Sequence, residues 1–255
     1  MEENKKKFKC RDCGKFYFDE PTLKKHRNNK ICVKNKEART CKICGTTYKR
    51  KQYYKIHLTT IGHKKNLEII NIANNADNET IKKYDIVSFG SEKIEEIYGK
   101  EELETKFPTK IFFEKYIFAV FTLTNTMNLN PDTPKYHNVI ITDLRSKYGQ
   151  IYKNNKWIKV KIDEITRSIV ENRRNDLKYL YKYLKNSEKI NKKLKFKLKK
   201  LIQKLDVDMD DESLNNKENK KYINCFMENL KNLIYENREM LLKTKKIANM
   251  INKKF

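Results

Sequence analysis

A set of four Cys and His residues that occurs twice near the N-terminus constrains this chain most. In each set a Cys-x2-Cys pair is followed by twelve residues, a His, five residues and a fourth Cys or His. The sets are Cys10, Cys13, His26 and Cys32, then Cys41, Cys44, His57 and His63. Four sulfur and nitrogen ligands at this spacing satisfy a tetrahedral Zn²⁺ ion, so the sequence predicts two zinc ions as cofactors.

Apolar residues between the ligands predict two small ββα modules. Tyr17 and Leu23 in the first set, and Tyr48 and Tyr54 in the second, occupy the two core positions of such a module. The first helix is expected to begin near Asp19, because an acidic side chain favours a helix N-terminus. So little core cannot fold alone, and metal binding is expected to supply most of the folding free energy.

Both stretches resemble the C2H2 zinc finger family. The first resembles a C2HC variant, because its fourth ligand is Cys32. The second ends in His57-Leu-Thr-Thr-Ile-Gly-His63-Lys-Lys, which is similar to the long-spacer fingers of the matrin, U1 and double-stranded-RNA-binding type. The resemblance implies a nucleic-acid ligand, either RNA or DNA. Protein contacts or a purely structural role are the alternatives for the fingers.

The charge of the chain agrees with a polyanionic partner. Lys and Arg number 58 against 33 Asp and Glu, a net charge of +25, and residues 1–70 hold 20 Lys and Arg against seven acidic residues. Such an excess steers a protein toward phosphate backbones. The predicted phosphate contacts are Lys24, Lys25, Arg27, Arg50, Lys51, Lys55, Lys64 and Lys65. The base-reading positions of the second finger, Arg50, Tyr53 and Ile56, favour backbone recognition over a strict sequence code.

The sequence predicts an α+β chain of several modules. Residues 1–35 form the C2HC finger and 36–73 the C2H2 finger, followed by a linker over 74–82. A small mixed α/β domain is expected over 83–163, and a basic helical hairpin or coiled coil over 164–255. The segment after His63 is expected to continue the finger helix.

Several segments of the mixed domain have a predicted structure. The apolar run Ile111–Thr124 favours one or two buried strands, with a helix as the alternative. Val139–Thr142 predicts a strand, and Asn154-Asn155 between two β-rich segments predicts a hairpin turn. The stretch from Asn130 to Trp157 resembles a block in uncharacterised proteins of giant DNA viruses, over roughly residues 110–180. This resemblance implies a viral origin, and it implies no particular activity because those viral proteins are uncharacterised.

The C-terminal region is rich in lysine and predicts helices. Leucines recur at three- and four-residue steps over Ile165–Leu205, interrupted near Ser187 and Asn191, and a second apolar stripe runs over Tyr222–Ile251. The lysines between them indicate either a solvated helix face or a second phosphate-binding surface. The helices are expected to fold back on each other or to pair between two chains, so self-association is a candidate property.

No catalytic constellation is predicted. His137-Asn138 would suit a metal-dependent nuclease, but the other three His residues are predicted zinc ligands. His137 is expected to be a hydrogen-bonded loop residue, and Trp157 a core or interface aromatic. Cys225 is expected to be a buried, reduced thiol, which with the zinc thiolates favours an intracellular, non-secreted protein. No apolar run is long enough for a membrane span.

Overall fold

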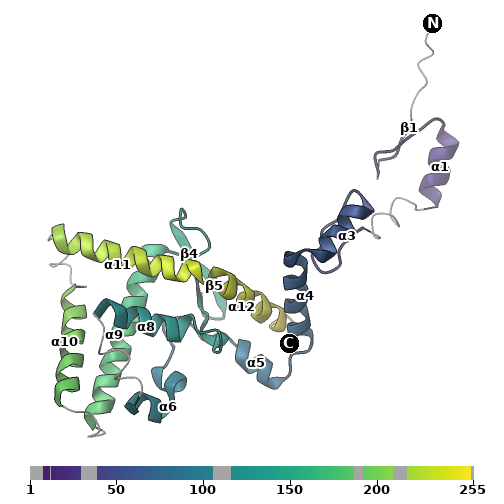
Figure 1. Cartoon of the computed structure of the whole chain (residues 1–255). Coiled ribbons are helices and arrows are strands. Elements are labelled where there is room, and N and C mark those ends of the chain that lie inside the picture. The colour runs from purple at the N-terminus through teal and green to yellow at the C-terminus, as the bar shows by residue number, and fades with distance from the viewer. Residues whose placement is uncertain are drawn as a thin grey trace. The chain divides into compact units, whose positions relative to one another are not determined.

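The computed structural model describes residues 8–11, 13–29, 39–105, 116–186, 192–208 and 217–253. The chain divides into two compact units, Met1–Asn75 and Ala76–Phe255, whose elements are labelled in Figure 1. The predicted Cys32 ligand lies outside the described residues. Among the helices in the described ranges, none has the length and apolar character needed to cross a membrane.

The first unit contains the two finger modules. Its elements are β1 (Phe8–Lys9), β2 (Phe16–Tyr17), α1 (Glu20–Asn28), α3 (Lys51–Thr59) and α4 (Ile61–Asn74). β1 and β2 pair antiparallel, and an isolated bridge joins Thr40 to Thr47 at the equivalent place in the second finger. The order β1-β2-α1 confirms the predicted ββα form of the first finger.

Asp19 caps helix α1, as predicted from the sequence. Its Oδ1 accepts a hydrogen bond from the backbone N–H of Thr22 at 2.7 Å, and Pro21 lies in the first turn. The side-chain and backbone hydrogen bonds of Thr22 hold the pKa of the Asp19 carboxyl below its ordinary value. Leu23 and Cys10 form the buried centre of this finger, with Phe8 and Tyr17 packed against them.

The second unit combines helices with a three-stranded sheet (Figure 1). Its strands are β3 (Val139–Ile140), β4 (Tyr148–Lys153) and β5 (Lys156–Lys161). Its helices are α5 (Asn78–Tyr84), α6 (Ile94–Thr105), α8 (Tyr116–Asn128), the 3₁₀ turn η1 (Pro134–Tyr136), α9 (Ile162–Asn186), α10 (Lys192–Asp208), α11 (Lys217–Glu236) and α12 (Arg238–Ile251). Helix α5 overlaps the end of the predicted linker over 74–82.

The sheet is an antiparallel β3-β4-β5 arrangement that includes the predicted hairpin. Asn154 and Asn155 form its turn with φ of 52° and 59°, a conformation that asparagine tolerates better than most residues. Helix α9 packs on one face through Ile165, which lies against Gly149. Helix α12 covers part of the other face, where Ala248 joins Tyr152 in a buried cluster.

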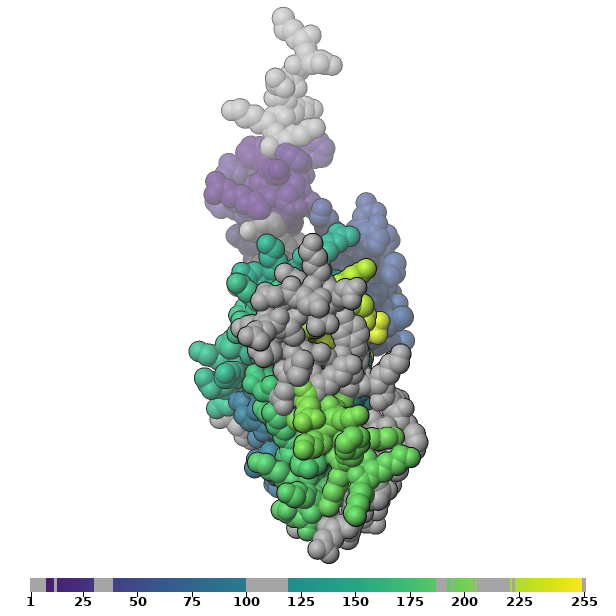
Figure 2. All heavy atoms as spheres, turned by 90° about the vertical axis from the view of Figure 1, so that its left-hand side faces the viewer, coloured from purple at the N-terminus to yellow at the C-terminus, as the bar shows by residue number. Residues whose placement is uncertain are grey.

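A large hydrophobic core joins most elements of the second unit. Among the described residues, its buried members come from the helices α8 to α12, from the sheet and from Phe89 and Ile94, and they include Leu123, Ile140, Leu177, Leu198 and Leu230. The sequence predicts residues 83–163 and 164–255 as separate parts. The structure joins them in one unit because the apolar stripe of α9 contacts both the sheet and the helices α8, α10 and α11. Within the described residues, α9 therefore pairs with α10 and α11 of its own chain, and the side chains of α9 and α10 lie side by side in Figure 2.

Two expectations for the second unit are wrong. Within Ile111–Thr124, the described part from Tyr116 onward is helical and belongs to α8 rather than to strands. Its buried residues Val120, Leu123 and Met127 recur at three- and four-residue steps, so burial on a helix face outweighs the β-rich composition. Cys225 is exposed and not buried. The buried stripe of α11 runs through Phe226 instead, and adjacent helical residues point about 100° apart.

A group of polar side chains is buried in the second unit beside this core. The Glu92 carboxylate accepts hydrogen bonds from Asn128 Nδ2 at 3.0 Å and from Asn138 Nδ2 at 2.7 Å. Arg173 is 1% exposed. Its Nη2 lies 4.0 Å from Glu92 Oε2, and its Nε lies 3.0 Å from Asp176 Oδ2. Most of these buried groups are paired with each other, which limits the cost of removing them from water.

Candidate metal centres

Both fingers begin with the same turn around their Cys-x2-Cys pair. In the first, Cys10 N–H donates to Lys15 O at 2.8 Å and Gly14 N–H to Cys10 O at 2.9 Å. In the second, Cys41 N–H donates to Thr46 O at 2.9 Å and Gly45 N–H to Cys41 O at 2.8 Å. Gly14 and Gly45 both have φ of 69°, a left-handed conformation that glycine adopts without steric cost. This turn brings the two thiols of each pair together.

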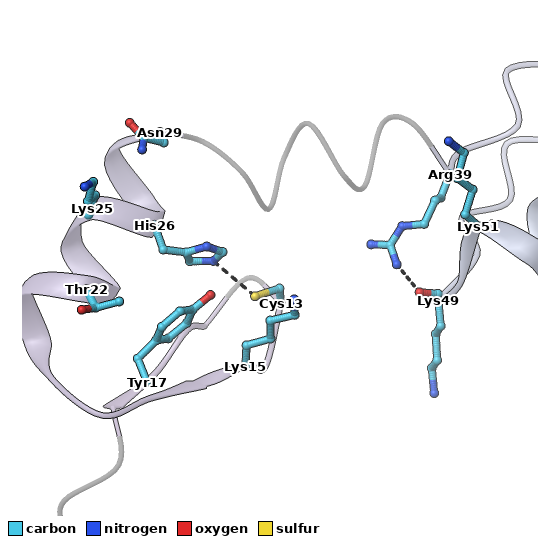
Figure 3. A pocket seen from close by; sticks show the side chains of 10 residues that line it. All are labelled: Cys13, Lys15, Tyr17, Thr22, Lys25, His26, Asn29, Arg39, Lys49 and Lys51. Atoms are coloured by element: carbon cyan, nitrogen blue, oxygen red, sulfur yellow. Dashed lines mark hydrogen bonds between the residues drawn. The ribbon is translucent and has the colours of Figure 1, made fainter.

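Three predicted ligands, Cys10, Cys13 and His26, meet in the first finger, and Figure 3 shows two of them, Cys13 and His26. Cys13 Sγ lies 3.4 Å from His26 Nε2, and the ligand atoms of Cys10, Cys13 and His26 all lie within 4.8 Å of one another. The side chains of Cys10 and His26 are buried, whereas Cys13 is exposed. The ring of Tyr17 lies 4.9 Å from that of His26. The predicted core aromatic therefore supports the histidine ligand.

All four predicted ligands meet in the second finger. Cys41, Cys44, His57 and His63 have ligand atoms within 4.8 Å of one another. His63 presents Nδ1, which lies 3.5 Å from Cys41 Sγ and 3.6 Å from Cys44 Sγ. Tyr48 stacks on His57 with ring centroids 4.9 Å apart, the same separation as between the tilted rings of Tyr17 and His26 in the first finger.

These distances fit zinc. Zn–S bonds of about 2.3 Å and Zn–N bonds of about 2.0 Å in a tetrahedron imply a sulfur–nitrogen separation of about 3.5 Å. The observed separations of 3.4 to 3.6 Å agree with that value. In addition, His57 Nε2 is buried and has no hydrogen-bond partner among the residues that the structure describes. A metal ion at the centre of the four ligands would satisfy this nitrogen, and it would hold together a fold that has little apolar core.

A helix break at Thr60 allows both His57 and His63 to face one ion. Residues six positions apart on a continuous helix are rotated by about 240° and point to different sides. Thr60 has extended backbone angles (φ −67°, ψ 147°), so α3 ends at Thr59 and α4 begins at Ile61. The helix predicted to continue past His63 is therefore a second helix with its own N-terminus.

The Thr60 hydroxyl stabilises this break from both sides. It donates to the carbonyl of His57 at 2.7 Å, and it accepts from the backbone N–H of His63 at 3.3 Å. One side chain thus connects the backbones of the two histidine ligands. Asn66, one turn further along α4, donates from Nδ2 to Cys44 Sγ at 3.5 Å. Hydrogen bonds of this kind orient metal ligands and stabilise the thiolate.

Residue-by-residue prediction missed Gly14, Gly45, Thr60 and Asn66. The two glycines could have been predicted from the sequence, because a glycine directly follows the Cys-x2-Cys pair in both fingers. The five-residue spacing between the histidines also implies a break, and Thr is a common helix N-cap. Asn66 carries no signal in the sequence, because its contact depends on how α4 packs on the Cys pair.

The eight predicted phosphate-binding residues are all exposed. Three lie on α1, Arg50 precedes α3, two lie on α3, and Lys64 and Lys65 are the fourth and fifth residues of α4. Arg39 donates to the Lys49 carbonyl across the turn of the second finger (Figure 3). Apolar side chains share this surface, since Tyr53 is 49% exposed and Ile56 59%.

His137 has the predicted role of a hydrogen-bonded loop residue. Its Nδ1 pairs with Thr244 Oγ1 at 2.8 Å and its Nε2 with Asn130 O at 2.9 Å. Its side chain is 1% exposed, and burial lowers the pKa of its imidazole. Trp157 packs partly buried against the core, with the ring of Tyr152 at 5.5 Å, as expected of a core or interface aromatic.

Comparison with known proteins identifies the two fingers. Residues 8–29 and 40–63 match the family model described as "Zinc finger, C2H2 type". No curated protein and no solved structure matches the chain significantly. The two segments are thus C2H2-type fingers with sites for two zinc ions. The resemblance of residues 110–180 to giant DNA virus proteins stays a prediction.

Proposed function

We propose that the two C2H2-type fingers bind a nucleic-acid duplex, RNA or DNA, chiefly through its phosphate backbone. The observation that carries this proposal is the exposed basic surface of the zinc-held helices, where all eight predicted phosphate contacts are accessible. Zinc supplies the fold and takes no part in chemistry. We further propose that the chain is non-enzymatic, acts inside the cell, and has a regulatory or packaging role in a large DNA virus.

Backbone recognition is favoured because the second finger has few groups that read bases. Of its reading positions, Arg50 can pair with guanine, whereas Ile56 can offer only apolar contact. Lys64 and Lys65 are adjacent on α4, immediately after the ligand His63, and both are exposed. The zinc centre thus fixes the start of the helix that presents these two charges to phosphates.

The test is the double variant Lys64→Gln/Lys65→Gln. Its affinity for duplex RNA or DNA should fall equally for all sequences, and the slope of log K against log salt should become shallower by about 2, one unit for each lost phosphate contact. Fluorescence anisotropy titrations of the zinc-loaded protein at several salt concentrations measure both quantities.

The matched control is Lys82→Gln/Lys83→Gln. These two lysines are also adjacent and exposed on a helix, but they belong to α5 of the second unit. The control should keep the wild-type salt slope. An unchanged slope in the Lys64/Lys65 variant would contradict the assignment of these residues. His57→Ala should abolish any preference for one type of duplex if recognition depends on the second finger.

Exposed apolar residues favour a second candidate function, a protein-interaction scaffold. Ile56 is 59% exposed and Ile61 is 74% exposed, on neighbouring helices of the second finger. Fingers and C-terminal helices would then bind proteins, or a second copy of the chain, and the charge would serve solubility. This candidate predicts that Ile56→Ser/Ile61→Ser removes partner binding without changing the affinity for nucleic acid. Sedimentation velocity distinguishes self-association from a monomer.

A further inference from the structure

The β4–β5 hairpin of the second unit carries positive charge without any negative charge. Between Asp143 and Asp163 the chain has no acidic residue and six basic ones. All six are exposed, and within the described part of the chain none of them forms an ion pair. They are Arg145, Lys147, Lys153, Lys156, Lys159 and Lys161. Unpaired, exposed cations on a rigid element suit an anionic partner.

The strand register places an aromatic side chain among these cations. Tyr148 pairs with Lys161, and Gln150 pairs with Lys159, so Tyr148, Lys159 and Lys161 share one face of the hairpin. Lys159 Nζ lies 4.5 Å from the centroid of the Tyr148 ring. Tyr148 is 43% exposed, a high value for a large side chain on a sheet.

Helix α12 packs against this face at Tyr152 and Trp157 and reaches Gln150 in its middle. There Tyr152 packs with Trp157 and Ala248, and Lys245 lies 4.8 Å above the Trp157 ring while donating to Gln150. Tyr148, Lys159 and Lys161, at the end of the face away from Tyr152 and Trp157, are exposed. The face therefore has a packed end that anchors it and an exposed end that can receive a ligand.

The backbone beneath Tyr148 is held rigidly. A Cβ atom on Gly149 would lie 2.9 Å from Ile140 O and 2.9 Å from Ile165 Cδ1, so glycine is required for this close packing. Tyr148 N–H donates to Ser146 Oγ at 3.0 Å, and Ile162 N–H donates to Lys147 O at 3.0 Å. A ring on such a fixed backbone is preorganised for binding and loses little entropy when a ligand stacks on it.

We propose that this face binds single-stranded nucleic acid, with a base stacked on Tyr148 and neighbouring phosphates held by Lys159 and Lys161. An exposed aromatic ring beside cations is the arrangement that single strands use, because their bases have free faces. A duplex keeps its base faces stacked and would use only the lysines. The site belongs to Ala76–Phe255 and does not depend on the function proposed for the fingers.

The experiment measures binding of the full-length, zinc-loaded chain to a fluorescein-labelled oligouridine. Tyr148→Ala should weaken binding about tenfold, and Tyr148→Phe should retain it, because a stacked base contributes on the order of 1–3 kcal/mol. Lys159→Gln/Lys161→Gln should make the salt slope shallower by about 1.4, since each phosphate contact to a single strand contributes about 0.7. A 4-thiouridine probe should cross-link to a peptide that contains Tyr148.

Controls separate this site from general charge and from the fingers. Lys182→Gln/Lys185→Gln removes two exposed lysines from α9 of the same unit and should leave oligouridine binding unchanged. Equal losses in the two lysine variants would overturn the proposal, as would a cross-link confined to finger peptides. If the lysine variant merely aggregates, the lysines serve to protect the edge strand β5, and the proposal also fails. Finger variants should affect duplex binding alone, so either proposal can fail separately.

Discussion

The surroundings of the Asp176 carboxyl group disfavour its ionised form. Burial raises its pKa to about 6 from the ordinary 3.8; the nearby Arg173 guanidinium lowers it, and Glu92 and Glu95 raise it further. Arg173 Nε lies 3.0 Å from Asp176 Oδ2, but the two atoms are not aligned as a hydrogen bond. The charge attraction between them therefore only partly offsets the cost of burial.

This raised pKa predicts a pH-dependent stability. The folded state binds the Asp176 proton more tightly than the unfolded state. The contribution of protonated Asp176 to the free energy of unfolding is therefore fully present below about pH 4 and is lost as the pH rises through about 6. The free energy of unfolding falls by at most about 3 kcal/mol through this effect. Urea denaturation of wild type and Asp176→Asn between pH 4 and 7.5 tests this. The decline with pH should be smaller in the variant, and parallel curves would contradict the prediction.

At the scale of single elements, the break between α3 and α4 is the device that forms the second zinc centre. Thr60→Ala removes the hydroxyl that connects the backbones of His57 and His63. Loss of such a cap costs about 1 kcal/mol, so zinc affinity of the second finger should fall about fivefold. Competition with a chromophoric chelator measures this affinity.

A neighbouring threonine provides the control for that prediction. Thr59 is also exposed, and its hydroxyl donates to Ile56 O at 2.8 Å without reaching a ligand residue. Thr59→Ala should therefore keep the wild-type zinc affinity, and Thr60→Ser should restore most of what Thr60→Ala loses. Equal losses at both positions would mean that the hydroxyl of Thr60 stabilises the helices in general and has no special role at the metal site.

The elements that the sequence predicts correctly are those whose signals are local. The Asp19 cap and the Asn154-Asn155 turn each follow from the conformational preferences of one or two residues. Seven of the eight predicted ligands, all but Cys32, meet in the structure, and they follow from spacing alone. By contrast, the strands expected within Ile111–Thr124 are replaced by α8, because burial of Leu123 and Met127 against other elements decides the outcome. The exposure of Cys225 likewise depends on which side of α11 faces the core.

At the scale of the whole molecule, the two units gain their stability from different sources. The buried centre of the first finger consists of Cys10 and Leu23 with two partly buried aromatics. The second unit has a large shared core, and among the described residues no member of that core comes from Met1–Asn75. Zinc is therefore expected to hold the first unit folded, whereas hydrophobic burial holds the second.

Zinc removal should thus unfold one unit and spare the other. Hydrogen–deuterium exchange of the full chain after chelation should show lost protection in peptides from residues 8–74, and unchanged protection in peptides from α9 and α12. Zinc addition should restore the lost protection, and His57→Ala should lose it over 40–74 even with zinc present. Retained protection in the fingers would show that they fold without metal, and lost protection in α9 would show that the second unit also depends on the zinc centres.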